Sequence, residues 1–178
     1  MNDDNSHWAD KLYQIMRKPY FPKGDLAELR RGQSRHSAGQ ASPALWKTLV
    51  HYVPEDQWSQ DGQQVGHNRV RQMQVICGLL AELAHRVPPG SGLRLGRAMA
   101  QADVSEARVM RLLKAHGEEL YDSLRGVVHL LASQGIPVRP SDLARLVLWD
   151  GTRFEEQPRN SIARDYYSKA KRTASQGS

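Results

Sequence analysis

The chain has 178 residues, which suits one compact unit or two small subdomains with a real hydrophobic core. Its formal net charge of +6 and its pI near 9.7 favour an anionic partner. No apolar run approaches the roughly 18 residues that cross a bilayer, so we expect no membrane partner. Two acids stand among Met1–Asn5, where a secretory signal would need cations, and the expected location is the cytoplasm.

Apolar residues recur at helical spacing along the chain, and strand alternation is nearly absent. The first expected helix runs from Ser6 to Lys18 and ends before Pro19. A short helix follows from Asp25 to Arg31, and then a polar loop over 32–40. The later expected helices cover 43–53, 68–86, two short segments between 93 and 114, 118–134, 141–149 and 158–174, and a loop with one helical turn covers 55–66.

This pattern predicts an all-α fold, a helical bundle of about eight to nine helices in one or two packed subdomains. The strongest interruption is the proline- and glycine-rich segment 88–92. The predicted organisation is therefore an N-terminal helical subdomain over 1–88, a C-terminal helical subdomain over 93–174 and a frayed tail over 175–178. Ser42, Ser105 and Ser141 precede or begin expected helices, and each is a predicted N-cap.

Residues that would carry catalysis or bind a metal form no recognised pattern. Cys77 shares a helical face with apolar residues and is expected to be a buried small hydrophobe. The seven histidines show no metal-ligand spacing. Asp150, Glu155 and Glu156 are interpreted as parts of a solvated loop. We therefore expect no enzymatic activity, no cofactor and no metal site.

Cations are concentrated between Arg86 and Lys114, where six of them stand against two acids, Asp103 and Glu106. In the helix expected at 105–114, a helical projection places Arg108, Arg111 and Lys114 opposite the apolar residues. A cluster of one charge sign on consecutive helices is typical of nucleic-acid-binding proteins. The sequence thus predicts a surface that binds a phosphate backbone.

We expect four residues at the centre of this surface, Arg97, Arg108, Arg111 and Lys114, and five as extensions, Arg30, Arg31, Arg69, Arg94 and Arg125. Alternatives remain for several of them. Arg97 is also compatible with an internal pair to Asp103 or Glu106, and Arg125 and Arg145 are compatible with structural ion pairs. The role of Arg164 is open, and Tyr166 and Tyr167 fit either packing or base stacking.

Five segments in order resemble one known family. They are Leu26–Arg31 with the sequence LAELRR, Leu95–Ala100 with LGRAMA, Glu106–Ala115 with EARVMRLLKA, Leu124–Arg125, and Leu143–Trp149 with LARLVLW. This order is similar to the small subunit of the type I-E CRISPR Cascade complex, the CasB family, over Asp25 to Tyr167. Gly126 and Ile162 depart from the family pattern, which has a second arginine and an aromatic residue there.

The resemblance implies a non-catalytic, all-helical subunit that is present in two copies within an RNA-guided complex. It implies the CRISPR RNA, the target DNA and the displaced strand as partners, together with the other Cascade subunits and a second copy of this chain. In such complexes base pairing reads the sequence while protein cations hold the backbones. A helix-turn-helix DNA-binding regulator and a helical adaptor for an acidic protein remain alternatives on charge alone.

Overall fold

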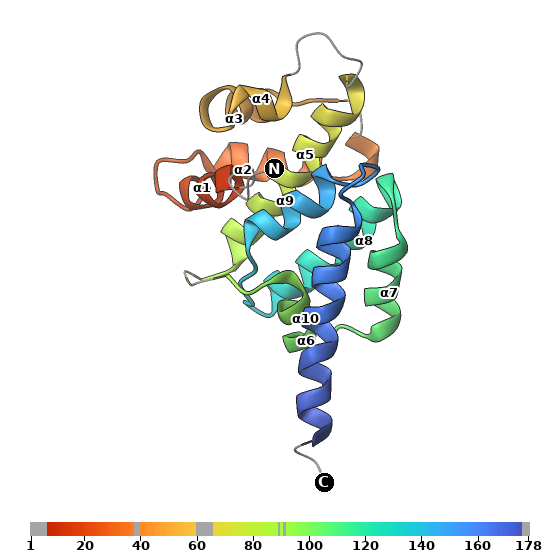
Figure 1. Cartoon of the computed structure of the whole chain (residues 1–178). Helices are drawn as coiled ribbons and strands as arrows, with labels where there is room; N and C mark the ends of the chain where they lie inside the picture. Colours follow the sequence, from red (N-terminus) through yellow and green to blue (C-terminus); the bar gives the residue numbers. More distant parts are fainter. Residues whose placement is uncertain (1–6, 38–39, 60–65, 89, 91, 176–178) are drawn as a thin grey trace. The chain divides into compact units, whose positions relative to one another are not determined.

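The computed structural model describes residues 7–37, 40–59, 66–88, 90 and 92–175, and in this part of the chain the predicted all-α fold is confirmed (Figure 1). Its helices are α1 (His7–Met16), α2 (Lys23–Gly32), α3 (Pro43–Tyr52), α4 (Glu55–Trp58), α5 (Gly66–Arg86), α6 (Leu95–Gln101), α7 (Glu106–Lys114), α8 (Gly117–Ser133), α9 (Pro140–Leu148) and α10 (Glu156–Ser175). None of the described helices has the length and apolar content that crossing a membrane requires.

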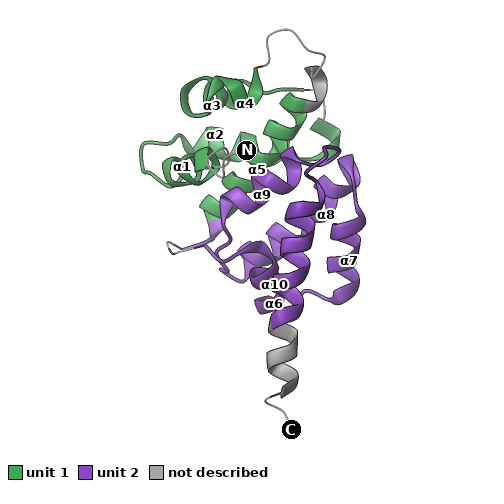
Figure 2. Ribbon diagram, viewed as in Figure 1, with its two compact units in different colours: residues 1–85 green, residues 86–178 purple. Residues whose placement is uncertain are grey.

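The chain divides into two compact units, residues 1–85 (unit 1) and residues 86–178 (unit 2) (Figure 2). The predicted boundary, at 88–93, lies a little further along the chain. Most of the predicted tail, residues 176–178, is outside the described residues. Each unit is described separately below.

Unit 1 is built around α5, which is buried on all sides from Arg71 to Leu83. Helix α1 contributes the stripe Trp8, Leu12 and Met16, at the spacing that places side chains on one helical face. Cys77 lies on α5 and is fully buried, as predicted. Burial raises the pKa of its thiol to about 12.

Two polar side chains of α5 donate hydrogen bonds to backbone oxygens at the end of α2 and in the segment that follows it. The Arg71 guanidinium donates to the Gly32 oxygen at 3.2 Å and to the Gln33 oxygen at 3.3 Å. Gln74 Nε2 donates to the oxygens of Ser37 and Gln40, each at 3.1 Å. Helix ends leave carbonyl oxygens without intrahelical partners, so these buried donors satisfy groups that would otherwise destabilise the fold.

The three predicted serine caps have different outcomes. Ser42 is confirmed, because its side chain accepts a hydrogen bond from the Leu45 amide at 3.2 Å. Ser105 is the N-cap residue of α7, but its side chain makes no capping hydrogen bond, so that part of the prediction is wrong. The Ser141 cap is wrong, because α9 already begins at Pro140, whose fixed φ suits the first helical position, and Arg139 is the N-cap.

Unit 2 is organised around α10, which packs against α6, α9 and α7 (Figure 1). The closest approach is at Gly96 on α6, where an added Cβ would collide with the Ile162 carbonyl oxygen of α10. The amide of Leu95, at the start of α6, donates to Asp142 Oδ2 of α9 at 2.9 Å. Helix α6 is thus fixed between α9 and α10.

Candidate nucleic-acid interface

Helix α7 presents a basic face because its core-facing residues recur at helical spacing. Val109 and Leu112 are fully buried, whereas Arg108, Arg111 and Lys114 are exposed. At 100° per residue Arg111 and Lys114 lie about 130° and 170° from the middle of the apolar pair, and Arg108 lies at the edge of the apolar side, about 40° from Leu112. The amphipathic arrangement predicted for this helix is therefore the one that the structure has.

Arg97 is exposed on α6, and residues 102–105 connect α6 to α7. Among the described residues, neither Arg97 nor the three cations of α7 form an ion pair or a side-chain hydrogen bond. Arg97 therefore forms no ion pair with Asp103 or Glu106 in the described part of the chain, which was the alternative considered for it. Four cations on two consecutive helices remain available to an external anion.

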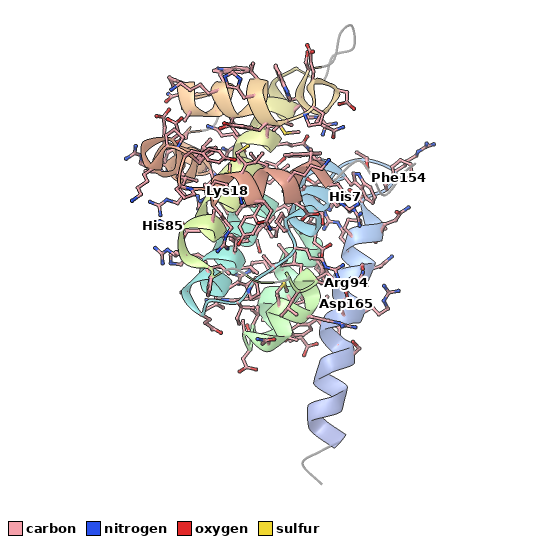
Figure 3. All side chains as sticks on the ribbon, turned by 90° about the vertical axis from the view of Figure 1, so that its left-hand side faces the viewer. His7, Lys18, His85, Arg94, Phe154 and Asp165 are labelled. Atoms are coloured by element: carbon pink, nitrogen blue, oxygen red, sulfur yellow. The ribbon has the colours of Figure 1, made fainter. Side chains whose placement is uncertain are left out.

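Two of the predicted extensions in unit 2 are paired internally. Arg94 Nε lies 2.9 Å from Asp165 Oδ2 (Figure 3). The Arg94 guanidinium also donates to Ser161. Arg125 Nη2 donates to Asp122 Oδ1 at 3.0 Å, one helical turn away on α8. A phosphate at either position would have to compete with a carboxylate of the same chain.

The other three extensions lie in unit 1. Arg31 is exposed in the last turn of α2. Arg30 Nη1 lies 4.0 Å from Glu82 Oε2 of α5, and both side chains are mostly covered. Arg69, on α5, is half-buried and takes part in internal interactions. Of these three, Arg31 offers the most accessible charge.

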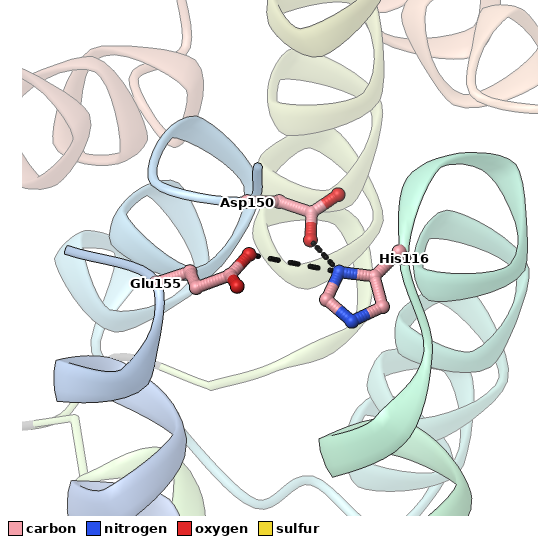
Figure 4. A group of neighbouring side chains, drawn as sticks. All are labelled: His116, Asp150 and Glu155. Atoms are coloured by element: carbon pink, nitrogen blue, oxygen red, sulfur yellow. Dashed lines mark hydrogen bonds and ion pairs between the residues drawn. The ribbon is translucent and has the colours of Figure 1, made fainter. Parts of the chain in front are cut away.

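A buried ion pair between Arg159 and Asp150 lies beside the C-terminal end of α7. Figure 4 shows Asp150 with its neighbours His116 and Glu155. Arg159 of α10 is 5% exposed, and its Nη2 donates to Asp150 Oδ1 at 2.8 Å; the Asp150 side chain is 8% exposed. His116 Nδ1 lies 2.9 Å from the same oxygen, and Glu155 Oε2 lies 3.7 Å from that nitrogen. The interpretation of Asp150 as part of a solvated loop is therefore wrong, because Arg159 supplies a charge that allows this carboxylate to be buried.

This network fixes the junction between α7 and α8. The Arg159 guanidinium donates to the Leu113 oxygen and to the Ala115 oxygen, the latter at 2.9 Å, where α7 ends. Asp150 Oδ2 accepts from the Gly117 amide at 2.8 Å, where α8 begins. Carbonyl groups at a helix end and amides at a helix start lack intrahelical partners, so one ion pair satisfies both ends of the turn.

The same group includes three potential metal ligands. His116, Asp150 and Glu155 each offer one ligand atom, and these atoms lie within 4.8 Å of one another. Both oxygens of the Asp150 carboxylate, however, already accept hydrogen bonds, Oδ1 from the Arg159 guanidinium and Oδ2 from the Gly117 amide. We interpret the group as an ion-pair network that positions α7, because its hydrogen bonds account for each of its carboxylates.

Two tyrosines of α10 hold the turn between α6 and α7. The Tyr166 hydroxyl donates to the Val104 oxygen at 2.6 Å, and the Tyr167 hydroxyl donates to Glu106 Oε1 at 2.9 Å. The hydrogen bond to Glu106 raises the pKa of Tyr167. Asp103, in this turn, has a φ of 52°, a left-handed conformation that aspartate tolerates better than most residues. These contacts favour the packing role of the tyrosines over base stacking.

The positioning residues Asp150 and Arg159 were not identified from the sequence as a structural pair. One signal was present: Arg159, Ile162 and Tyr166 follow the i, i+3, i+7 spacing of a core-facing stripe. A cation on such a stripe indicates a buried charge with a partner. The charged partner, Asp150, is nine residues away, whereas the carbonyl partners Leu113 and Ala115 are 46 and 44 residues away and depend on the tertiary fold.

A family model described as CRISPR-associated protein Cse2 matches residues 25–167. No curated protein and no solved structure matches the chain.

Proposed function

Because the chain belongs to the CRISPR-associated Cse2 family, the small subunit of the type I-E Cascade complex, we propose that it binds nucleic-acid backbones through Arg97, Arg108, Arg111 and Lys114. The observation that carries the proposal is that these four cations are exposed and, among the described residues, have no internal partner. Arginine suits this task because its planar guanidinium holds two phosphate oxygens at once.

In this proposal the protein is a non-catalytic subunit that holds backbones while the guide RNA reads the sequence. Its partners are the CRISPR RNA, the target DNA and the displaced strand, along with the other Cascade subunits and a second copy of the chain. Diffuse phosphate contacts without a base-reading motif agree with this role, because backbone contacts position a strand without discriminating bases. Family membership favours this role over a helix-turn-helix DNA-binding regulator and over a helical adaptor for an acidic protein.

The direct test reverses two charges on α7. We expect R108E/R111E to weaken binding to a labelled poly(dT) oligonucleotide at least about tenfold, since each charged hydrogen bond contributes about 1.5 kcal/mol or more. Fluorescence anisotropy measures the affinity. Far-ultraviolet circular dichroism should show the wild-type helical signal, because both side chains point to solvent.

A matched control separates a local site from a general effect of net charge. K11E/K18E makes the same change in charge at two exposed lysines of unit 1. We expect this variant to keep an affinity close to that of the wild type. An equal loss of affinity in both variants would contradict a site on α7. An affinity for one specific duplex that is orders of magnitude higher than the affinity for random single strands would favour the DNA-binding regulator.

A further inference from the structure

Helix α3 of unit 1 is apolar on two opposite sides. Ala44, Leu45 and Leu49 are buried on one side. At 100° per residue, Pro43, Trp46 and Val50 fall within about 60° of one another on the other side. A helix that is apolar all round is normally buried all round, so the second side of α3 is unusual on a surface.

That second side is open in the described part of the chain. Trp46 is 41% exposed and Val50 is 62% exposed. The Trp58 ring of α4 packs edge-on against Trp46, with ring centroids 6.2 Å apart, and its indole nitrogen donates to the Val53 oxygen at 3.3 Å. We define Pro43, Trp46, Val50 and Trp58 as the α3–α4 face. Its indole rings are held in place rather than free to turn inward, which is typical of an interface anchor.

Charge identifies the class of partner. Lys47 borders the α3–α4 face, but its ammonium group lies 3.9 Å from Asp25 Oδ1, so its charge is compensated. Glu55 and Asp56, at the start of α4, are exposed on the helix that carries Trp58. This border repels phosphate and attracts arginine or lysine. The face therefore does not suit a nucleic acid.

The distribution of charge along the chain supports the same conclusion. Residues 1–85 hold 10 Lys and Arg against 9 Asp and Glu, whereas residues 86–178 hold 15 against 10. Of the five large hydrophobic residues that are exposed in the described part of the chain, four are in unit 1: Tyr20, Trp46, Val50 and Tyr52. The cation excess and the exposed apolar surface are thus on different units.

We propose that the α3–α4 face docks a different protein subunit of the complex, one that presents aliphatic or aromatic side chains bordered by arginine or lysine. A symmetric contact with a second copy would place the acids of α4 against each other. A contact with the surface of α6 and α7 in unit 2 of a second copy would cover the cations proposed to bind phosphate. A separate, basic subunit avoids both conflicts; the exclusion of the basic surface of unit 2 rests on the proposed function.

The test is assembly of the complete complex, co-expressed with its guide RNA and purified through another subunit. V50E places a carboxylate at an exposed position, so folding is expected to be unaffected. We expect it to reduce retention of this subunit at least about tenfold, because a charge would be desolvated against an apolar partner. The control is Q14E, which introduces the same charge at an exposed position of α1.

Further measurements on the isolated chain test whether a nucleic acid or a second copy binds the α3–α4 face instead. We expect V50E to bind poly(dT) as the wild type does and both proteins to sediment with the same mass. Wild-type retention of V50E in the complex would overturn the proposal. A loss of poly(dT) affinity would assign the face to nucleic acid, and a dimer abolished by V50E would assign it to a second copy. Failure of R108E/R111E to weaken binding would reject the proposed phosphate surface, and the sedimentation measurement alone would then decide between a second copy and a separate subunit.

Discussion

At the residue scale, Arg159 is the clearest case of a charge that is required inside unit 2. Its guanidinium compensates Asp150 and donates to two carbonyl oxygens at the end of α7. We expect R159M to reduce the free energy of unfolding by about 3–5 kcal/mol, because it leaves the Asp150 carboxylate buried without a cation. Urea denaturation followed by circular dichroism measures the loss.

Two further variants show whether that loss comes from the ion pair. R153M removes an exposed arginine from the same connection between α9 and α10, and we expect it to cost less than about 1 kcal/mol. D150N/R159M should cost less than the sum of its two single substitutions, because both remove one shared interaction. Additive losses would mean that the pair does not couple α10 to the α7–α8 junction.

Cys77 provides a second prediction at this scale. With its pKa raised to about 12 by burial, about one thiol in ten thousand would be ionised at about pH 8, and the thiolate is the reactive form. We expect almost no reaction of native protein with Ellman's reagent. In denaturing urea the pKa should return to about 8.5, and the single thiol should then react completely. Rapid, complete reaction of the native protein would contradict its burial.

At the element scale, the contact between α6 and α10 depends on the absence of a side chain at position 96. We expect G96A to destabilise the protein by about 1–3 kcal/mol, because the new Cβ meets the Ile162 carbonyl oxygen, which is part of a helix backbone and has little freedom to move. Thermal unfolding measures the change. Since α6 carries Arg97, a shift of α6 should also weaken poly(dT) binding.

Gly126 is the matched control for that substitution. It lies within α8, is exposed and has no atom near an added Cβ. We expect G126A to stabilise the protein by about 0.5–1 kcal/mol, because glycine loses more conformational freedom on folding than alanine does. If both substitutions changed stability in the same direction, close packing at Gly96 would not be the reason for its glycine.

The helices could be predicted because their signals are local. Spacing alone places Val109 and Leu112 on one side of α7 and Arg111 and Lys114 on the other. The ion pair of Arg94 with Asp165 could not be predicted in this way, because it joins α10 to the segment before α6. Spacing identifies exposed cations well, whereas it cannot tell which of them meet a carboxylate from elsewhere in the chain.

At the scale of the whole molecule, the number of uncompensated cations sets the salt dependence of binding. The affinity for single strands falls with the logarithm of salt concentration at a slope of about −0.7 for each phosphate contact. If Arg97, Arg108, Arg111 and Lys114 each hold one phosphate, we expect a slope of about −2.8 for the complete chain. Anisotropy titrations with poly(dT) over a range of salt concentrations measure it.

Single substitutions then test whether the two helices form one surface. Replacing any one of the four cations by alanine should reduce the magnitude of the slope by about 0.7, whereas K11A in unit 1 should leave it unchanged. A slope unaffected by R97A would restrict the surface to α7. A wild-type slope much steeper than four contacts allow would mean that other cations take part, Arg31 first, because it is exposed and carries its charge at the end of α2.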